Sequence, residues 1–294
     1  MTLTRPVRLA AAFAAAALAA GCAGRGPGTG EPRADDMAVG GARFRIVYWP
    51  ADAAAARQVA GAVREAAPHV IRWGVLATPV TITIYPSHDA LEGAVHRRGY
   101  AWLRAWARYQ TIDLQSPSTW GVFGASDREV RELVAHELTH CAMYQLAGDD
   151  QNWMYKEIPL WFSEGLASVA ARQDHRRRDL RDLYRFYAQE APGSADGLAG
   201  AHARAALGAT PAGDPIVDPD PLYQEQWEIV YGAAHHAVAF LLARYGEERV
   251  HRVVKLMGDG LRFPAAFREA IGISDAEFAS DFRRYVVWQG WRRD

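Results

Sequence analysis

The sequence predicts an α+β fold in which a small α/β lobe precedes an α-helical lobe. Residues 80–85 alternate between apolar and polar side chains, which is typical of a strand with one buried face. From Val130 to Ala142, apolar residues recur every three or four positions, which predicts a helix with one buried face. Beyond Ala171 the pattern is helical, interrupted by one segment rich in Gly, Pro and Asp at 191–221. That segment could form a cover over a cleft or be disordered.

The expected α/β lobe covers residues 43–125 and contains a few strands and two helices. Its first helix is rich in alanine, and Val59 and Val63 share one face of it. A loop with Pro117 and Gly121 leads out of the lobe. The expected strands are 44–49, 80–85 and 109–114, and the expected helices are 52–67 and 89–98.

The helix that follows this lobe has clear start and stop signals. Ser126 and Glu129 form a capping-box pattern before the apolar stripe, and Gly148 is a stop signal after it. The remaining residues, up to 294, are expected to form the helical lobe. Its further helices are expected at 179–190, 224–245, 247–257, 264–271 and 275–288.

Within that helix stands the pattern HExxH, formed by His136, Glu137 and His140. Residues four apart lie on one helix face, so both imidazoles can reach one metal ion. Glu137 lies between them and can take a proton from a water molecule that the metal activates. Two His alone are an incomplete site, because a catalytic zinc usually has three protein ligands and an open position for water.

Glu164 is the candidate for the third ligand. It is surrounded in the sequence by Trp161, Phe162 and Leu166, and an isolated carboxylate is costly to bury among such residues unless it is paired or binds metal. The alternatives are a solvated glutamate or an ion pair with an arginine such as Arg172.

These two motifs resemble those of the gluzincin metallopeptidases, most closely the bacterial peptidase MA-like group. Its pattern is HExxH, a short connection and then W-x-x-E-G-x-A, which this chain matches at 136–140 and 161–167. The remainder, roughly 43–290, is similar in layout only. The resemblance implies a zincin, thermolysin-like catalytic domain with an α/β upper lobe and a helical lower lobe. It also implies one Zn²⁺ per chain, held by His136, His140 and Glu164.

The same resemblance suggests two further features. A Tyr or His of the helical lobe often donates a hydrogen bond to the oxyanion, and Tyr231 is the first choice here, with His235 in reserve. A core or surface tyrosine, and a structural histidine, are the alternatives. Residues 109–114 are a candidate edge strand that pairs with an extended substrate, or else an interior strand. Aromatic residues around 102–106 and 161–162 are expected in the core.

The N-terminus resembles a bacterial lipoprotein signal. Arg5 and Arg8 precede an apolar run at 9–20, which is too short to span a bilayer. Small residues before Cys22 resemble a lipobox, although Leu18 lies one position further from the cysteine than usual. The expectation is a signal peptide at 1–22, a lipid on Cys22, a flexible tether at 23–42 and a membrane-anchored, extracytoplasmic protein. Plain secretion is the rival.

Charge and cysteine content limit the other functions. The net charge is −1, and loss of Arg5 and Arg8 with the signal leaves 31 of 33 basic residues against 34 acidic ones. Neither sign dominates, so no nucleic-acid partner is implied. If Cys22 carries lipid, Cys141 has no partner for a disulfide and is expected to be a small buried hydrophobe.

The sequence thus predicts a zinc metallopeptidase that acts on a peptide or protein substrate. The alternative is a catalytically inactive zincin-fold lipoprotein that binds a peptide or an envelope component, and intact Glu137 argues against it. Hydrolysis of a non-peptide amide is a third option.

Overall fold

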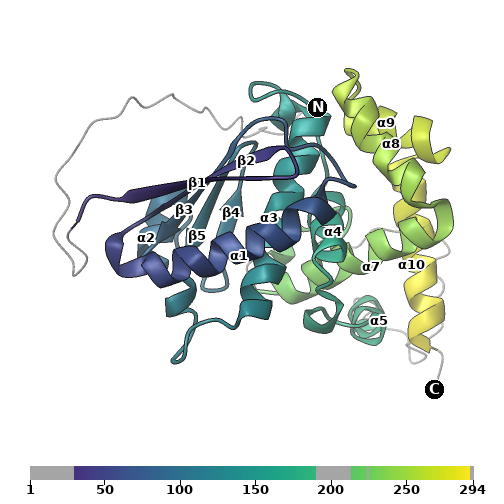
Figure 1. The fold of residues 1–294 in the computed structure, drawn as a ribbon. Helices are drawn as coiled ribbons and strands as arrows, with labels where there is room; N and C mark the ends of the chain where they lie inside the picture. Colours follow the sequence, from purple (N-terminus) through teal and green to yellow (C-terminus); the bar gives the residue numbers. More distant parts are fainter. Residues whose placement is uncertain (1–29, 190–212, 224, 292–294) are drawn as a thin grey trace, which may run out of the picture.

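The computed structural model describes residues 30–189, 213–223 and 225–291. It has a sheet lobe and a lobe made of helices, arranged side by side (Figure 1). The mixed α+β architecture expected from the sequence is therefore confirmed in this coarse form. The predicted signal peptide, Cys22 and most of the 191–221 segment lie outside the described residues.

The sheet has five strands in the order β1-β2-β3-β5-β4. β2, β3 and β5 run parallel to one another, and β1 and β4 are antiparallel to their single neighbours. β3 has the bounds that its alternating pattern predicts. The strands are β1 (Arg33–Val39), β2 (Ala42–Tyr48), β3 (Val80–Tyr85), β4 (Ala105–Ala107) and β5 (Thr111–Gln115).

The position of β5 corrects the expectation of an edge strand at 109–114. β5 lies between β3 and β4, so it is the interior strand given as the alternative, and the edge on this side of the sheet is β4. β4 has only three residues, Ala105, Trp106 and Ala107, which is too short for a visible alternating pattern. The chain reverses from β4 into β5 through a turn in which Arg108 N–H donates to Thr111 O at 2.8 Å.

β1 lies inside the segment that the sequence analysis assigned to a flexible tether. It pairs with β2 along its whole length, with Val39 opposite Ala42. Gly40 and Gly41 join the two strands, both with positive φ (55° and 89°). A two-residue turn of this kind needs such φ values, which glycine adopts without a steric cost. The glycine pair therefore makes a hairpin, not a linker.

Helices cover both faces of the sheet. α1 (Ala53–Val70) and α3 (Asp127–Ala147) pack on the face that carries Ile46, Ile82 and Leu114, where these strand residues share one core cluster with residues of both helices (Figure 1). α2 (His88–Val95) packs on the opposite face. Helix α3, which carries the HExxH motif, therefore borders both the sheet and the helical lobe.

The helical lobe has a second, aromatic core. Trp161 and Phe162 are buried in it, as the sequence predicts, together with Phe263 and Phe278. Among the described residues no helix is long and apolar enough to cross a bilayer. The helices are α4 (Leu160–Ala170), α5 (Leu180–Gln189), α7 (Trp227–Tyr245), α8 (Glu247–Gly258), α9 (Phe263–Ile271) and α10 (Asp275–Trp291).

Gly165 sets how closely α4 approaches α7. A Cβ atom at this position would lie 2.2 Å from Ala234 O and 2.6 Å from Val238 Cγ2, so only glycine fits without displacing a helix. Its neighbour Glu164 is thereby held on the side of α4 that faces α3. The glycine of the W-x-x-E-G-x-A pattern thus has a packing role next to the predicted third ligand.

Candidate metal centre and active site

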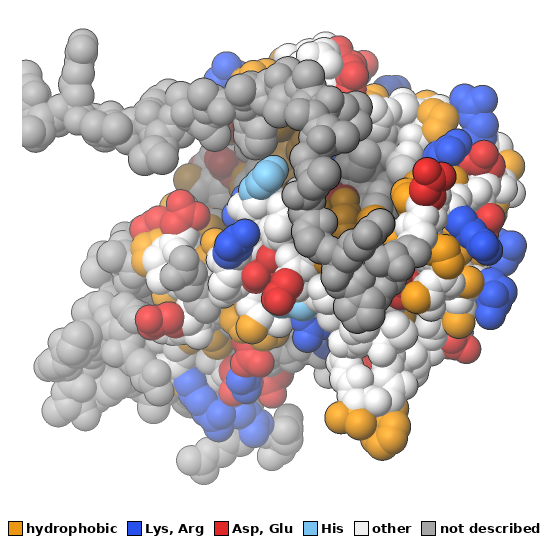
Figure 2. Space-filling model, turned by 90° about the vertical axis from the view of Figure 1, so that its left-hand side faces the viewer, with side chains coloured by type: hydrophobic (Ala, Val, Ile, Leu, Met, Phe, Trp, Pro, Cys, Tyr) orange, Lys and Arg blue, Asp and Glu red, His pale blue; other side chains and the backbone are white. Residues whose placement is uncertain are grey.

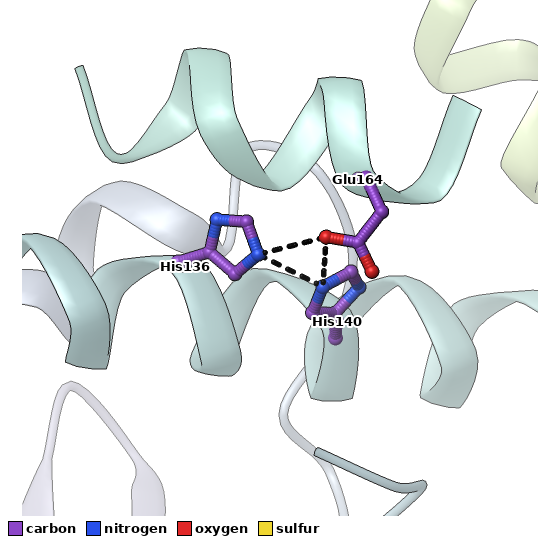
Figure 3. A group of neighbouring side chains, drawn as sticks. All are labelled: His136, His140 and Glu164. Atoms are coloured by element: carbon purple, nitrogen blue, oxygen red, sulfur yellow. Dashed lines mark hydrogen bonds and ion pairs between the residues drawn. The ribbon is translucent and has the colours of Figure 1, made fainter. Parts of the chain in front are cut away.

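α3 presents both histidines of the motif to one point. The capping box forms as predicted: Glu129 N–H donates to Ser126 Oγ at 3.3 Å, and Ser126 N–H donates to Glu129 Oε2 at 2.9 Å. The helix ends before Gly148. His136 and His140 lie one turn apart and point toward Glu164 of α4, which approaches from the other side (Figure 3).

Three potential ligand atoms converge here. His136 Nε2 lies 3.1 Å from Glu164 Oε2 and 3.2 Å from His140 Nε2, and His140 Nε2 lies 3.6 Å from Glu164 Oε2. Two ligands of a tetrahedral zinc, each about 2.0–2.1 Å from the ion, are roughly 3.3–3.4 Å apart. The donor set and its spacing therefore fit a zinc ion with three protein ligands. Of the described residues, only these three form such a cluster of His, Cys, Asp and Glu.

The electrostatics favour an ionised Glu164. Burial is the largest single influence and raises its pKa, but the adjacent His140 and His136 outweigh it and hold the pKa well below the usual range. Burial lowers the pKa of His136, which favours the neutral imidazole that binds metal. An anionic carboxylate and a neutral imidazole are the forms in which Glu164 and His136 bind zinc. Burial lowers the pKa of His140 too, but the carboxylates of Glu164 and Glu137 outweigh it and raise that pKa.

Glu137 lies in the same cleft and is buried. Burial raises its pKa to about 7, and the adjacent His140 and a hydrogen bond from the backbone of Ala107 in β4 partly oppose this. A carboxylate whose pKa lies near neutral pH is suited to accept and return a proton at that pH. The edge strand, the motif helix and the candidate base therefore meet at one place.

Gln173 is a site residue that the sequence analysis did not identify. Its Oε1 lies 3.1 Å from His136 Nδ1, and Arg177 Nη2–H donates to the same oxygen. An Nδ1–H donated to Gln173 leaves the Nε2 lone pair of His136 free to bind a metal. Gln173 follows α4 in a turn where Arg172 adopts a positive φ of 55°, and nothing in the sequence predicts where that turn directs its side chains.

The cleft above these residues has a volume of about 270 Å³ and lies between the two lobes. Trp102 and Trp106 are half-buried against the small core cluster of Leu91, Val95 and Leu103, and they also line the cleft, so the expectation that they belong to the core is met only in part. Trp102 stacks on Trp227 of α7 with ring centroids 5.7 Å apart, and it also contacts Tyr231 and Tyr223. These rings connect the sheet lobe to the helical lobe at the cleft.

Tyr231 lines the cleft and is half-buried. Its hydroxyl lies 3.2 Å from that of Tyr223, and the guanidinium carbon of Arg177 lies 5.3 Å from its ring centre. The reserve candidate His235 is not among the cleft-lining residues. Its Nδ1 lies 3.0 Å from Ser168 Oγ in the interior, which is the structural role that the sequence analysis gave as the alternative.

Two other residues of α3 adjoin the site. Tyr144 lies one turn beyond His140 and its ring stacks on the imidazole, with centroids 5.8 Å apart. The spacing of four residues could have predicted this contact. Cys141 is fully buried, as predicted, and its thiol donates to Arg108 O at 3.1 Å. Arg172 is exposed, and among the described residues the ion-pair partners of Glu164 are His136 and His140 instead.

Comparison with known proteins gives low-similarity structural matches. No family model matches the chain, and no curated protein matches it in sequence. It is similar to the structure of a two-domain M1 zinc metallopeptidase mutant bound to L-arginine (14% identity, TM-score 0.41, 87% of this chain and 51% of the other). It is also similar to an M1 zinc metallopeptidase from Deinococcus radiodurans (13% identity, TM-score 0.39, 90% and 53%). The chain thus spans about half the length of these structures.

Proposed function

We propose that the protein is a zinc-dependent metallopeptidase with a zincin-type, thermolysin-like catalytic domain. The observation that carries the proposal is the convergence of His136, His140 and Glu164 within 4.8 Å in a cleft that also holds buried Glu137. A site that only binds zinc for structural purposes is normally closed by a fourth protein ligand. Here the described residues supply three ligands and a general base beside them.

Each residue has a defined task in this proposal. His136, His140 and Glu164 hold the ion, which when bound supplies a Lewis acid and makes a water molecule acidic. Glu137 accepts the proton of the attacking water and later returns it to the leaving amine. Gln173 orients His136 through the Nδ1 hydrogen bond.

Tyr231 is proposed to donate its hydroxyl proton in a hydrogen bond to the oxyanion that develops on the substrate carbonyl. It lies on the cleft wall and its hydroxyl contacts only Tyr223 among the described residues, which leaves the bond free to be exchanged for one to substrate. The open edge of β4, next to Glu137, is proposed to pair with the extended substrate backbone.

We propose in addition that the protein acts outside the cytoplasm, anchored by a lipid on Cys22. The support is the sequence pattern alone: Arg5 and Arg8, the apolar run 9–20 and the small residues before Cys22. Secretion without an anchor is the alternative. Cys22→Ala should abolish lipid attachment and release the protein from membranes, and unchanged membrane association would contradict the anchor.

Hydrolysis of a peptide library by purified protein tests the proposed activity. Cleavage should stop on treatment with a chelator and return when Zn²⁺ is added. A protein that binds zinc and library peptides without cleaving them would instead be the inactive, peptide-binding alternative. Hydrolysis of non-peptide amides alone would identify the third option. Chelator-insensitive cleavage would contradict the proposal.

A further inference from the structure

Arginines outnumber carboxylates among the residues that line the cleft, although the whole chain is nearly neutral. The chain has a net charge of −1, and acidic and basic side chains are interspersed over the face shown in Figure 2. The cleft is lined by Arg104, Arg176 and Arg177 but by only two carboxylates, Glu137 and Glu164. Both carboxylates have tasks at the proposed metal site. An arginine excess at such a place favours an anionic group on the substrate.

One of these arginines is already neutralised. Arg176 Nε lies 2.8 Å from Glu132 Oε2 and its Nη2 lies 3.5 Å from Glu129 Oε1. Arg177, the next residue, forms no ion pair with a carboxylate among the described residues. The next residue, Arg178, by contrast forms an ion pair with Glu228.

Arg177 retains donors that no protein atom uses. A guanidinium has five N–H donors. One at Nε is given to Ser168 Oγ at 2.9 Å, and one at Nη2 is given to Gln173 Oε1. Three donors therefore have no partner in the described part of the chain, including both at Nη1. Nη1 is also absent from the fully buried atoms that lack a partner, so it has some access to solvent, and Arg177 is one of the residues that line the cleft.

Buried partners hold the guanidinium of Arg177 in a fixed position. Ser168 is fully buried and Gln173 is buried, so both acceptors are fixed, and the ring of Tyr231 lies against the cation. A binding group that is immobilised before the ligand arrives loses less entropy on binding. Arg177 also donates to the glutamine that orients His136, so its guanidinium lies next to a residue that contacts a proposed metal ligand.

We infer that Arg177 is a specificity-determining residue that binds a carboxylate of the peptide substrate. The inference rests on the proposed function and narrows its substrate class to peptides that carry an anionic group near the scissile bond. The planar arrangement of the free donors suits a carboxylate, which accepts two parallel N–H bonds. The carboxylate can be the free C-terminus of a peptide or the side chain of Asp or Glu.

Peptide binding to the zinc-loaded Glu137→Gln protein tests the inference, because that background should bind peptides without turnover. Three hexapeptides are compared by calorimetry: one of Ala, Leu and Phe with a free C-terminus, the same peptide as its C-terminal amide, and an amidated form with one internal Glu. On the Arg177 protein, the form with the recognised carboxylate should bind on the order of 10- to 100-fold more tightly than the uncharged amide. Arg177→Met should abolish this preference.

Controls separate recognition from structural damage. Arg178→Met, a change of the adjacent arginine outside the cleft, should leave the preference intact. Arg177→Lys replaces Arg177→Met if the latter is poorly folded. It keeps the charge but not the paired donors, so its preference for the carboxylate should be reduced. Zinc content is measured for every variant. A preference for the free C-terminus identifies the terminal carboxylate, and a preference for internal Glu identifies the side chain.

The outcomes distinguish this inference from the proposed function. If wild type cleaves library peptides but the three hexapeptides bind equally, Arg177 does not select a carboxylate and the inference is wrong, while the peptidase proposal stands. A preference that survives in Arg177→Met also contradicts it. A protein that neither binds nor cleaves any peptide contradicts both.

Discussion

Gln173 Oε1 lies 3.1 Å from Nδ1 of His136, and this contact joins the turn after α4 to the metal-binding face of α3. The amide oxygen can only accept, so His136 must donate from Nδ1. The ring is then fixed with Nε2 directed at Glu164 and His140. Gln173 does not contact the proposed ligand atom Nε2, but it sets the tautomer of the His136 ring that carries this atom.

Gln173→Leu should lower zinc affinity by about 10- to 100-fold, because the ring of His136 loses its acceptor. Competition with a chromogenic chelator measures the affinity. The matched control is Gln145→Leu, which removes a buried glutamine of α3 whose amide bonds Thr78 and Tyr109 instead. That change should reduce thermal stability and leave zinc affinity unaltered. Equal affinities in Gln173→Leu and wild type would remove Gln173 from the site.

Tyr231→Phe should reduce turnover on the order of 10²-fold with unchanged zinc content. A donor to the oxyanion acts when negative charge develops, so kcat should fall more than substrate affinity. Tyr223→Phe breaks the same tyrosine–tyrosine hydrogen bond from its other end and serves as the control. If both variants lose activity equally, the bond matters and the Tyr231 hydroxyl is not the donor. His235→Gln should leave turnover close to normal, because His235 does not line the cleft.

Gly165→Ala should destabilise the protein by roughly 1–3 kcal/mol, because the added methyl group overlaps Ala234 O and forces α4 away from α7. Displacement of α4 also moves Glu164, so zinc affinity should fall together with the melting temperature. Gly61→Ala is the matched control on α1, where an added Cβ meets nothing within 4 Å. It should raise the stability by about 0.5–1 kcal/mol, since alanine favours a helix interior. Equal effects of the two substitutions would contradict the packing argument.

Stability should depend on pH through His235. Burial, with smaller contributions from His236 and Arg177, lowers its pKa to about 4 in the folded protein, whereas an unfolded histidine has a pKa of about 6.5. Between these values only the unfolded chain binds the proton, so stability rises with pH across this window and is lost as pH falls toward 4. The contribution is up to about 3 kcal/mol.

Urea denaturation at pH 4.5 and pH 7 measures this effect. His235→Gln, whose amide can still bond Ser168, should show a smaller difference between the two pH values than wild type. His69→Gln, a change of an exposed histidine, should keep the wild-type difference. An unchanged difference in His235→Gln would show that the buried imidazole does not carry the pH dependence.

Helices and strands whose own residues contain a clear pattern or a start or stop signal were predicted from the sequence. β3 follows from strict alternation, and α3 begins and ends where its capping box and Gly148 indicate. β1 and β4 were missed because they contain no such local pattern. β4 is too short for a pattern, and β1 exists because a diglycine turn folds it back onto β2. Such pairing depends on the neighbouring strand, which a single sequence does not reveal.

The residues of the candidate site also fall into two groups: those that local sequence predicts and those that depend on tertiary contacts. His136 and His140 are one helical turn apart, so their shared face could be predicted from spacing, and Glu164 from its apolar setting. Gln173 and Arg177 reach the cleft only because the chain reverses after α4. Their position depends on tertiary geometry, and neither residue type forms a recognisable pattern with the histidines.

Wild type and Glu137→Gln are compared for hydrolysis of a fluorogenic peptide and for bound zinc in the same preparations, which tests the role of Glu137 beside the three proposed ligands. The amide keeps the size of the side chain but cannot accept a proton, and the three proposed ligands are untouched. We predict one zinc per chain in both proteins and peptide hydrolysis in wild type only. Hydrolysis by Glu137→Gln at near the wild-type rate, or an active wild type without zinc, would contradict the account.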